Sequence, residues 1–193
     1  MIFSPIEKVL EDLRAGKPVL VTDDESRENE GDAIIAAELA TPEWVAWMVR
    51  YTSGYLCAPM TEQRANDLDL PVMWQNNEDP HQTNYTVSVD AANRESTGIS
   101  AKERALTANV LADPSSTPKS LIRPGHVLPL RAKPGGVLER AGHTEAAVDL
   151  MRLAGLQQVG LMAEMVNDDG TMMRVPELFS VAERFDLSMT NIH

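Results

Sequence analysis

The sequence predicts an α+β fold, a mixed β-sheet flanked by helices within a single compact domain spanning residues 1–193. Short apolar runs alternate irregularly with helical patterns, unlike the regular strand and helix order of a doubly wound parallel sheet. Residues 167–170 read NDDG, a hairpin turn signal that favours antiparallel strands. The first predicted strand is not followed by a glycine-rich nucleotide fingerprint, which also argues against a wholly parallel sheet.

Helical patterns are marked by their start signals. Ser4 and Glu7 form a capping-box pattern with Pro5 between them, and apolar residues at helical spacing follow until Gly16. A second capping box, Ser100 with Glu103, predicts a helix to about residue 112. Further helices are expected to begin near Thr41, Thr61, Thr144 and Pro176.

Strands are predicted from short apolar or alternating runs bounded by turn residues. These runs cover residues 18–22, 33–37, 55–58, 85–90, 126–132, 159–166, 172–175 and 187–192. Between two of them, residues 70–83 (LPVMWQNNEDPHQT) are too rich in Asn, Asp and Pro for regular structure. A connection of this length in a compact domain is often a functional lid.

The composition excludes several classes of protein. The formal charge is −12, with 17 basic and 29 acidic residues, which argues against nucleic-acid binding. No apolar run reaches the roughly 18 residues of a membrane span, and the first residues do not resemble a signal peptide. The single cysteine, Cys57, cannot pair within the chain. A reducing, cytoplasmic location is therefore expected.

The stretch DDESRENEGD, residues 23–32, places six carboxylates and one arginine between two predicted strands. Such crowding of like charge favours a nearby cation, and Mg²⁺ prefers carboxylate oxygens. A solvated hairpin tip is the alternative. Arg27 within the run favours a functional loop, because arginine binds anions through two parallel hydrogen bonds. Gly31 near its end also favours one, because glycine permits a backbone turn that orients the neighbouring side chains.

Three other residues have alternative interpretations. His143 is expected at a helix N-terminus, where it is either structural or a neutral, metal-ligating imidazole near bound anion. Glu164 lies in an apolar run, either at a sheet edge or as a desolvated group suited to proton transfer. Cys57 is either a small buried hydrophobe or a chemical group, and the first is favoured.

Six motifs, in order, resemble the 3,4-dihydroxy-2-butanone 4-phosphate synthase family of riboflavin biosynthesis. They are DDESRENEGD, HQTNYTVSVDA, GISAKERALT, RPGHVLPLRA, GGVLERAGHTEAAVDLMRLAG and AEMVNDDGTMMR, and they span residues 23–174. The resemblance implies a lyase that converts D-ribulose 5-phosphate into formate and L-3,4-dihydroxy-2-butanone 4-phosphate, through a metal-stabilised enediolate, a skeletal rearrangement and loss of C4. It implies Mg²⁺, or Mn²⁺ in its place, and a homodimer with sites at the subunit interface.

The resemblance also implies roles for individual residues. Glu28 and His143 match the metal ligands, and His126, Glu164 and Asp32 match catalytic positions. Substrate contacts are implied for Arg27, Glu28, Asp32, Arg140, Ala141, Gly142, His143, Thr144 and Glu164. Asp23 and Glu30 add titratable groups to the same site. Since no second catalytic domain follows residue 193, a monofunctional enzyme is expected.

Two alternatives belong to other classes. A sugar-phosphate isomerase would share the enediolate but release no carbon. A non-enzymatic module for binding divalent cations would use the acidic loop alone, and would need neither Arg140 nor His126 nor Glu164.

Overall fold

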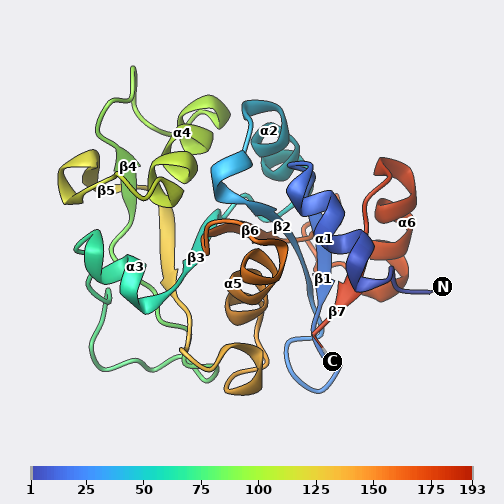
Figure 1. The fold of residues 1–193 in the computed structure, drawn as a ribbon. Helices are drawn as coiled ribbons and strands as arrows, with labels where there is room; N and C mark the ends of the chain where they lie inside the picture. Colours follow the sequence, from blue (N-terminus) through green and yellow to red (C-terminus); the bar gives the residue numbers. More distant parts are fainter. Residues whose placement is uncertain (1, 193) are drawn as a thin grey trace.

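The structure, a computed structural model, describes residues 2–192 as a mixed sheet with helices on both faces (Figure 1). The strands are β1 (Val19–Thr22), β2 (Gly31–Ala36), β3 (Cys57–Met60), β4 (Val89–Ala91), β5 (Leu121–Arg131), β6 (Gly160–Glu164) and β7 (Met189–Asn191). The helices are α1 (Ile6–Arg14), α2 (Pro42–Tyr51), α3 (Glu62–Asp67), α4 (Ala101–Ala112), α5 (His143–Ala154) and α6 (Val175–Phe185). Short 3-10 helices are η1 (Ala37–Leu39), η2 (Pro118–Ser120) and η3 (Gly136–Leu138).

The strand order across the sheet is β4-β5-β3-β6-β2-β1-β7. Strand β2 pairs antiparallel with both β1 and β6, whereas β3 is parallel to β5 and β1 is parallel to β7. The α+β class and the mixed sheet predicted from the sequence are confirmed.

The core lies on both faces of this sheet because its central strands are apolar on both sides. In β1, Leu20 packs with the helices α2, α4 and α6, while Val19 and Val21 face α1 and α5. The same alternation occurs in β2, where Ile35 and Ile34 point to opposite faces. Burying each such side chain contributes roughly 1.5 to 3 kcal/mol. The sheet is therefore held rigidly between two helical layers.

One end of the sheet gathers the ends of three strands. The antiparallel register places Thr22 opposite Gly31 and Asp32 opposite Glu164. The loop 23–30 connects β1 to β2 at this end, so its carboxylates lie beside the end of β6. The predicted acidic loop is thereby brought next to Glu164, which is distant in sequence.

Three local predictions were wrong. Ser4 does not cap α1; its hydroxyl and amide pair with the backbone of Met189 instead, because β7 passes beside the N-terminus. Regular strand pairing in β4 covers only residues 89–91, since Tyr85 and Thr86 make isolated bridges to different segments. Residues 172–175 make only one isolated bridge, between Met172 and Val166.

None of the helices within residues 2–192 has both the length and the apolar character needed to span a lipid bilayer.

Candidate active site

The acidic loop is organised by its first carboxylate. The buried Asp23 side chain accepts hydrogen bonds from the backbone amides of Glu28 at 3.0 Å and Glu30 at 2.9 Å. It also accepts one from Arg27 Nη1 at 3.0 Å. The loop therefore folds around Asp23, which holds Arg27 and the backbone of Glu28 and Glu30 in place, whereas Asp24 and Glu25 are exposed to solvent.

Gly31 has a different role from the one expected. The left-handed residue of this loop is Asn29, with φ of 55°, a conformation that asparagine tolerates better than most residues. Gly31 is the first residue of β2, where a Cβ atom would lie 2.3 Å from Leu178 Cδ1. The absence of a side chain at Gly31 allows α6 to pack closely against the sheet.

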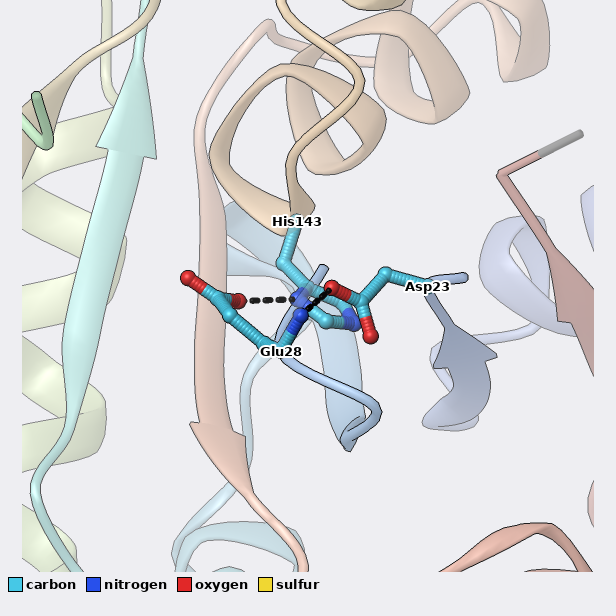
Figure 2. Close-up of side chains that lie close together, drawn as sticks. All are labelled: Asp23, Glu28 and His143. Carbon is cyan, nitrogen blue, oxygen red and sulfur yellow. Dashed lines mark hydrogen bonds and ion pairs between the residues drawn. The ribbon is translucent and has the colours of Figure 1, made fainter. Parts of the chain in front are cut away.

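Three potential metal ligands meet where the loop faces the start of α5. Ligand atoms of Asp23, Glu28 and His143 all lie within 4.8 Å of one another. Figure 2 shows the imidazole of His143 reaching down from α5 toward the two carboxylates of the loop. His143 Nδ1 lies 3.4 Å from Glu28 Oε2, and the side chain of His143 is only 5% exposed. His143 Nε2 has no hydrogen-bond partner within residues 2–192.

This donor set fits a divalent cation. Two carboxylates and an imidazole converge, and one imidazole nitrogen is buried and unsatisfied, which is costly without a ligand. Asp23 is already occupied by three hydrogen bonds, so Glu28 and His143 are the freer ligands of the three. A cation held by one or two protein carboxylates with other positions open is typical of Mg²⁺.

The charges of this cluster are strongly coupled. Burial alone would raise the pKa of Glu28, but the hydrogen bond from His143 and the charge of Arg27 outweigh it and lower this pKa to about 2. Burial would also lower the pKa of His143, yet Asp32, Glu28 and Asp23 outweigh it and raise this pKa to about 9. The expectation of a neutral imidazole was therefore wrong for the metal-free protein, because the carboxylates dominate over the helix dipole.

Asp32 and Glu164 lie on neighbouring strands beside this cluster. Asp32 is 2% exposed, and its Oδ1 finds no hydrogen-bond partner in the described part of the chain. Burial, together with the negative charges of Glu164 and Glu28, raises the pKa of Asp32 to about 7. Glu164 ends β6, where its Oε2 accepts a hydrogen bond of 2.6 Å from the hydroxyl of Ser53. Asp32 is thus able to gain or lose a proton near neutral pH.

Two arginines lie at the other side of the cluster. A Cβ atom on Gly142 would be 2.3 Å from Arg140 Nη1 and 2.9 Å from Arg27 Nη2, so both guanidinium groups converge on the residue that precedes α5. Arg27 pairs with Glu28 at 2.7 Å. Together with the positive end of the α5 dipole, these groups form a local anion-attracting region in an acidic protein.

Arg140 also connects distant segments. Its Nη1 pairs with the buried carboxylate of Glu145 at 2.5 Å, its Nη2 donates to Thr83 Oγ1 at 2.9 Å, and its Nε donates to the carbonyl oxygen of His81 at 2.9 Å. The end of the irregular segment 70–83 is therefore attached to the start of α5. The sequence suggested that this segment is a lid, but it did not show that Arg140 attaches the segment to the start of α5.

A small cavity of about 80 Å³ collects most of the residues predicted from the sequence. Its lining consists of Arg27, Glu28, Glu30, Asp32, Cys57, Thr83, Tyr85, Leu130, Arg140, His143, Thr144, Met162 and Glu164. Cys57 is 3% exposed, and burial raises the pKa of its thiol, which agrees with the favoured interpretation as a buried hydrophobe. Sequence reasoning missed Tyr85, Thr83 and Ser53 as neighbours of the site, since only tertiary contacts bring them there.

His126, Ala141 and Gly142 lie outside the lining of this cavity as the structure describes it. Leu130, which is part of the lining, follows His126 by four residues on β5, roughly 13 Å along an extended strand. The side chain of His126 is 38% exposed, and its Nδ1 lies 2.9 Å from Asp90 Oδ2. Within one chain, His126 is therefore not brought together with Glu28 and His143.

A larger cavity of about 390 Å³ is lined by residues of α3 and α5 and by Lys133. Its acidic residues are Glu62 and Asp149. Asp149 already pairs with Arg152 at 3.0 Å and accepts a hydrogen bond from the amide of Val137 at 2.9 Å. Within residues 2–192, the cluster of three potential metal ligands lies elsewhere, beside the smaller cavity, which is therefore the candidate active site.

The chain is similar to known proteins over most of its length. A family model described as 3,4-dihydroxy-2-butanone 4-phosphate synthase matches residues 7–193. The riboflavin biosynthesis protein RibBA of Salinispora arenicola is 62% identical over 183 residues, 95% of this chain and 43% of that protein. The chain thus spans less than half the length of this relative.

Two further relatives match over nearly their whole length. The 3,4-dihydroxy-2-butanone 4-phosphate synthase of Candida albicans is 52% identical over 193 residues, 100% of this chain and 95% of that protein. A crystal structure of a 3,4-dihydroxy-2-butanone 4-phosphate synthase in complex with two magnesium ions has a TM-score of 0.97 at 47% identity, covering 98% of this chain and 94% of that one.

Proposed function

The chain belongs to the 3,4-dihydroxy-2-butanone 4-phosphate synthase family, and from this premise we propose that it converts D-ribulose 5-phosphate into formate and L-3,4-dihydroxy-2-butanone 4-phosphate. The observation that carries the proposal is that one cavity is lined by two of the three clustered metal ligands, Glu28 and His143, by two arginines and by a buried carboxyl group. Metal ligands alone would suit a passive cation binder. The arginines and the buried Asp32 are the parts that a reaction on an anionic substrate requires.

We propose Glu28 and His143 as the ligands of Mg²⁺, with Mn²⁺ able to take its place. Bound there, the ion would act as a Lewis acid on the adjacent carbonyl and hydroxyl oxygens of the ketose phosphate. Asp23 fixes the loop that presents Glu28, through its hydrogen bonds to the amides of Glu28 and Glu30. The unpaired Nε2 of His143 and the close approach of Glu28 support this assignment.

The substrate phosphate and sugar oxygens are assigned to the region around Gly142. Arg27 and Arg140 converge there, and the backbone amides of His143 and Thr144 lie in the first turn of α5. Ala141, implied by the family motif, is exposed beside them. A cavity of about 80 Å³ is smaller than the roughly 300 Å³ of ordinary ligand sites. Segment 70–83 therefore has to open, or a second subunit has to extend the site, when the substrate binds.

Proton transfer is assigned to Asp32, Glu164 and His126. Asp32, with a pKa of about 7, is suited to accept and return a proton at neutral pH. Glu164 faces the same cavity, where the hydroxyl of Ser53 orients its carboxylate. His126 lies outside the cavity of its own chain, so its role requires that it reach the cavity of a partner chain. This supports a homodimer with the site at the interface.

We further propose that the chain forms one functional domain, works in the cytoplasm and binds neither nucleic acid nor membrane. The formal charge of −12 supports the absence of nucleic-acid binding, because phosphate backbones attract basic surfaces. Both arginines of the anion-attracting region, Arg27 and Arg140, line the small cavity, which suits a small phosphorylated substrate.

The function is tested by incubating the protein with ribulose 5-phosphate and Mg²⁺ and measuring formate with and without EDTA. Metal-dependent formate release is expected. An isomerase would consume the substrate without producing formate, and a passive cation-binding module would leave the substrate unchanged. Either result would contradict the proposal.

A further inference from the structure

We propose that Asp90 is the positioning residue for His126: its buried carboxylate fixes both the rotation and the tautomer of the imidazole, leaving Nε2 as the proton acceptor. This inference rests on the proposed function of His126. Asp90 lies in β4 and is 1% exposed. Neither the acidic loop nor the metal cluster includes it.

The carboxylate of Asp90 is attached to His126 at two points. Its Oδ1 accepts the backbone amide of His126 at 2.9 Å. Its Oδ2 lies 2.9 Å from Nδ1 of the His126 ring. An ionised carboxylate can only accept hydrogen bonds, so Nδ1 must carry the proton in this contact. Neutral imidazole carries one proton, and Nε2 is therefore left with its lone pair free.

The backbone is adapted to this contact. Val89 pairs with Val127, but the next residue, Asp90, pairs with Ile122, so four residues of β5 bulge around the Asp90 side chain. Bulges of this kind often re-aim a side chain near a functional site. The bulge presents the amide and the ring of His126 to the same carboxylate.

Two glycines make the close approach possible. A Cβ atom on Gly125 would lie 2.0 Å from the carbonyl carbon of Val89, so any other residue would push the two strands apart. Gly98, with φ of +99°, packs against the carboxylate, since a Cβ atom there would be 2.2 Å from Asp90 Oδ2. Arg94 Nε lies 3.8 Å from the same oxygen and supplies an opposite charge. Asp90 is thus held on several sides while His126 projects outward.

A purely structural role for Asp90 would be to brace the bulge through the His126 amide. Asp90→Asn distinguishes the two roles. The asparagine carbonyl oxygen can keep accepting the His126 amide, which directs its NH₂ group toward Nδ1 of the ring. Because NH₂ donates, Nδ1 must become the acceptor and the proton moves to Nε2. The substitution therefore preserves the hydrogen bond from the His126 amide and moves the ring proton from Nδ1 to Nε2.

The experiment uses the full-length protein labelled with ¹⁵N in histidine, and two-bond ¹⁵N–¹H correlation spectra report the protonated nitrogen of each ring. Wild-type His126 is expected to be protonated at Nδ1 and the Asp90→Asn variant at Nε2, while His81 is unchanged. The kcat for formate release should fall by roughly 10²- to 10⁴-fold, the contribution of one acid or base, with KM nearly unchanged. Combining Asp90→Asn with His126→Ala should cause no further loss beyond that of His126→Ala, because both changes remove the same function.

Asp149→Asn is the matched control, since Asp149 also accepts a backbone amide and pairs with an arginine, away from the candidate site. It should leave kcat unchanged. Protonation of wild-type His126 at Nε2 would overturn the inference, as would an active Asp90→Asn variant. A loss of activity with the Nδ1 tautomer retained would also overturn it and leave only the structural role. If the wild type releases no formate, the proposed function fails, whereas the tautomer spectrum still tests the contact between Asp90 and His126.

Discussion

At the scale of single residues, the protonation state of each charged group in the candidate site depends on its charged neighbours. Glu28, with a pKa lowered to about 2, stays ionised, whereas His143 and Asp32 have pKa values raised to about 9 and about 7. In the metal-free protein at neutral pH, His143 is therefore protonated and Asp32 is partly protonated. A divalent cation replaces the charge of the proton on His143, so metal binding and proton release are coupled.

Magnesium binding is predicted to release a proton from His143. Since the metal ligates only the neutral imidazole, the apparent affinity should rise about tenfold per pH unit from about pH 7 toward pH 9, and then level off. Calorimetric titration in two buffers with different ionisation enthalpies measures the number of protons released. Glu28→Gln should weaken the binding and its proton release together. An affinity for Mg²⁺ that is independent of pH in this window would contradict the assignment of His143 as a ligand.

Asp32→Asn is predicted to stabilise the metal-free protein at high pH while abolishing activity. The folded-state pKa of about 7 exceeds the ordinary value of 3.8, so the folded state binds more protons between these pH values and its stability falls as pH rises. Above pH 7 the cost reaches at most about 4 kcal/mol, the free energy of a shift of three pKa units. The neutral, isosteric amide avoids this cost.

The measurement is urea-induced unfolding in EDTA at pH 4 and pH 8. The variant should match the wild type at pH 4 and exceed its free energy of unfolding at pH 8. Equal stability of the two proteins at pH 8 would show that Asp32 is not held in an unfavourable buried environment.

At the scale of elements, the site depends on the start of α5 being joined to the segment 70–83. Arg140 makes this connection with all of its guanidinium nitrogens, to Glu145 in the helix and to Thr83 and His81 in the segment. The sheet supplies the other half of the site, because the register of β2 and β6 fixes Asp32 opposite Glu164. The end of this sheet therefore faces a segment whose last residues are attached to the start of α5 through Arg140.

Arg140→Lys is predicted to loosen the segment and weaken substrate binding. Lysine can keep the charge pair with Glu145, but it cannot also make the planar contacts to Thr83 and His81. We expect KM to rise by about tenfold or more, corresponding to the roughly 1.5 to 3 kcal/mol of a charge-assisted hydrogen bond. Faster hydrogen exchange in residues 70–83 should accompany the change.

Arg152→Lys, in the last turn of α5, is the matched control for this substitution. Its ion pair with Asp149 is exposed, with 58% of the arginine side chain accessible, and contributes little. It should leave KM unchanged. An unaltered KM in Arg140→Lys would remove Arg140 from substrate binding.

At the scale of the whole molecule, the chain builds two separate clusters of polar side chains around one sheet. The metal cluster lies where β1 and β6 end and β2 begins, whereas His126 and Asp90 lie on the edge pair β4 and β5. The cavity near the metal cluster is too small to enclose a sugar phosphate by itself. A symmetric pair of chains would let the His126 edge of each subunit complete the cavity of the other.

Mixing two inactive variants is predicted to restore activity. Glu28→Gln removes a metal ligand and His126→Ala removes the proton-transfer group. If each site combines Glu28 of one chain with His126 of the other, a mixed dimer has both substitutions in one site and neither in the second. Random exchange between equal amounts should recover about a quarter of wild-type activity. Formate release after co-refolding the two variants measures this. If His126 acted within its own chain, the mixture would remain inactive.

Much of the fold was predictable from local patterns. Apolar strands, capped helices such as the one started by Ser100, and the breakers between them follow from the chemistry of neighbouring residues. Predictions failed where a distant segment competed for the same groups. Ser4 pairs with Met189 across the sheet instead of capping α1, and Gly31 accommodates Leu178 instead of forming the turn.

The sequence by itself determined the α+β class, the family and the residue types of the site, because a motif is a set of residue types at short, fixed spacings that can be read directly from the chain. The family motifs also implied that Glu28 and His143 share a metal. Tertiary structure alone decided how closely these two side chains approach, that Arg140 holds the segment at Thr83, and that Asp90 reaches His126. The physical reason is that a pKa or a hydrogen bond depends on distance in space and on exclusion of water. Strand register and helix packing fix both of these, and the spacing of residues along the chain does not contain them.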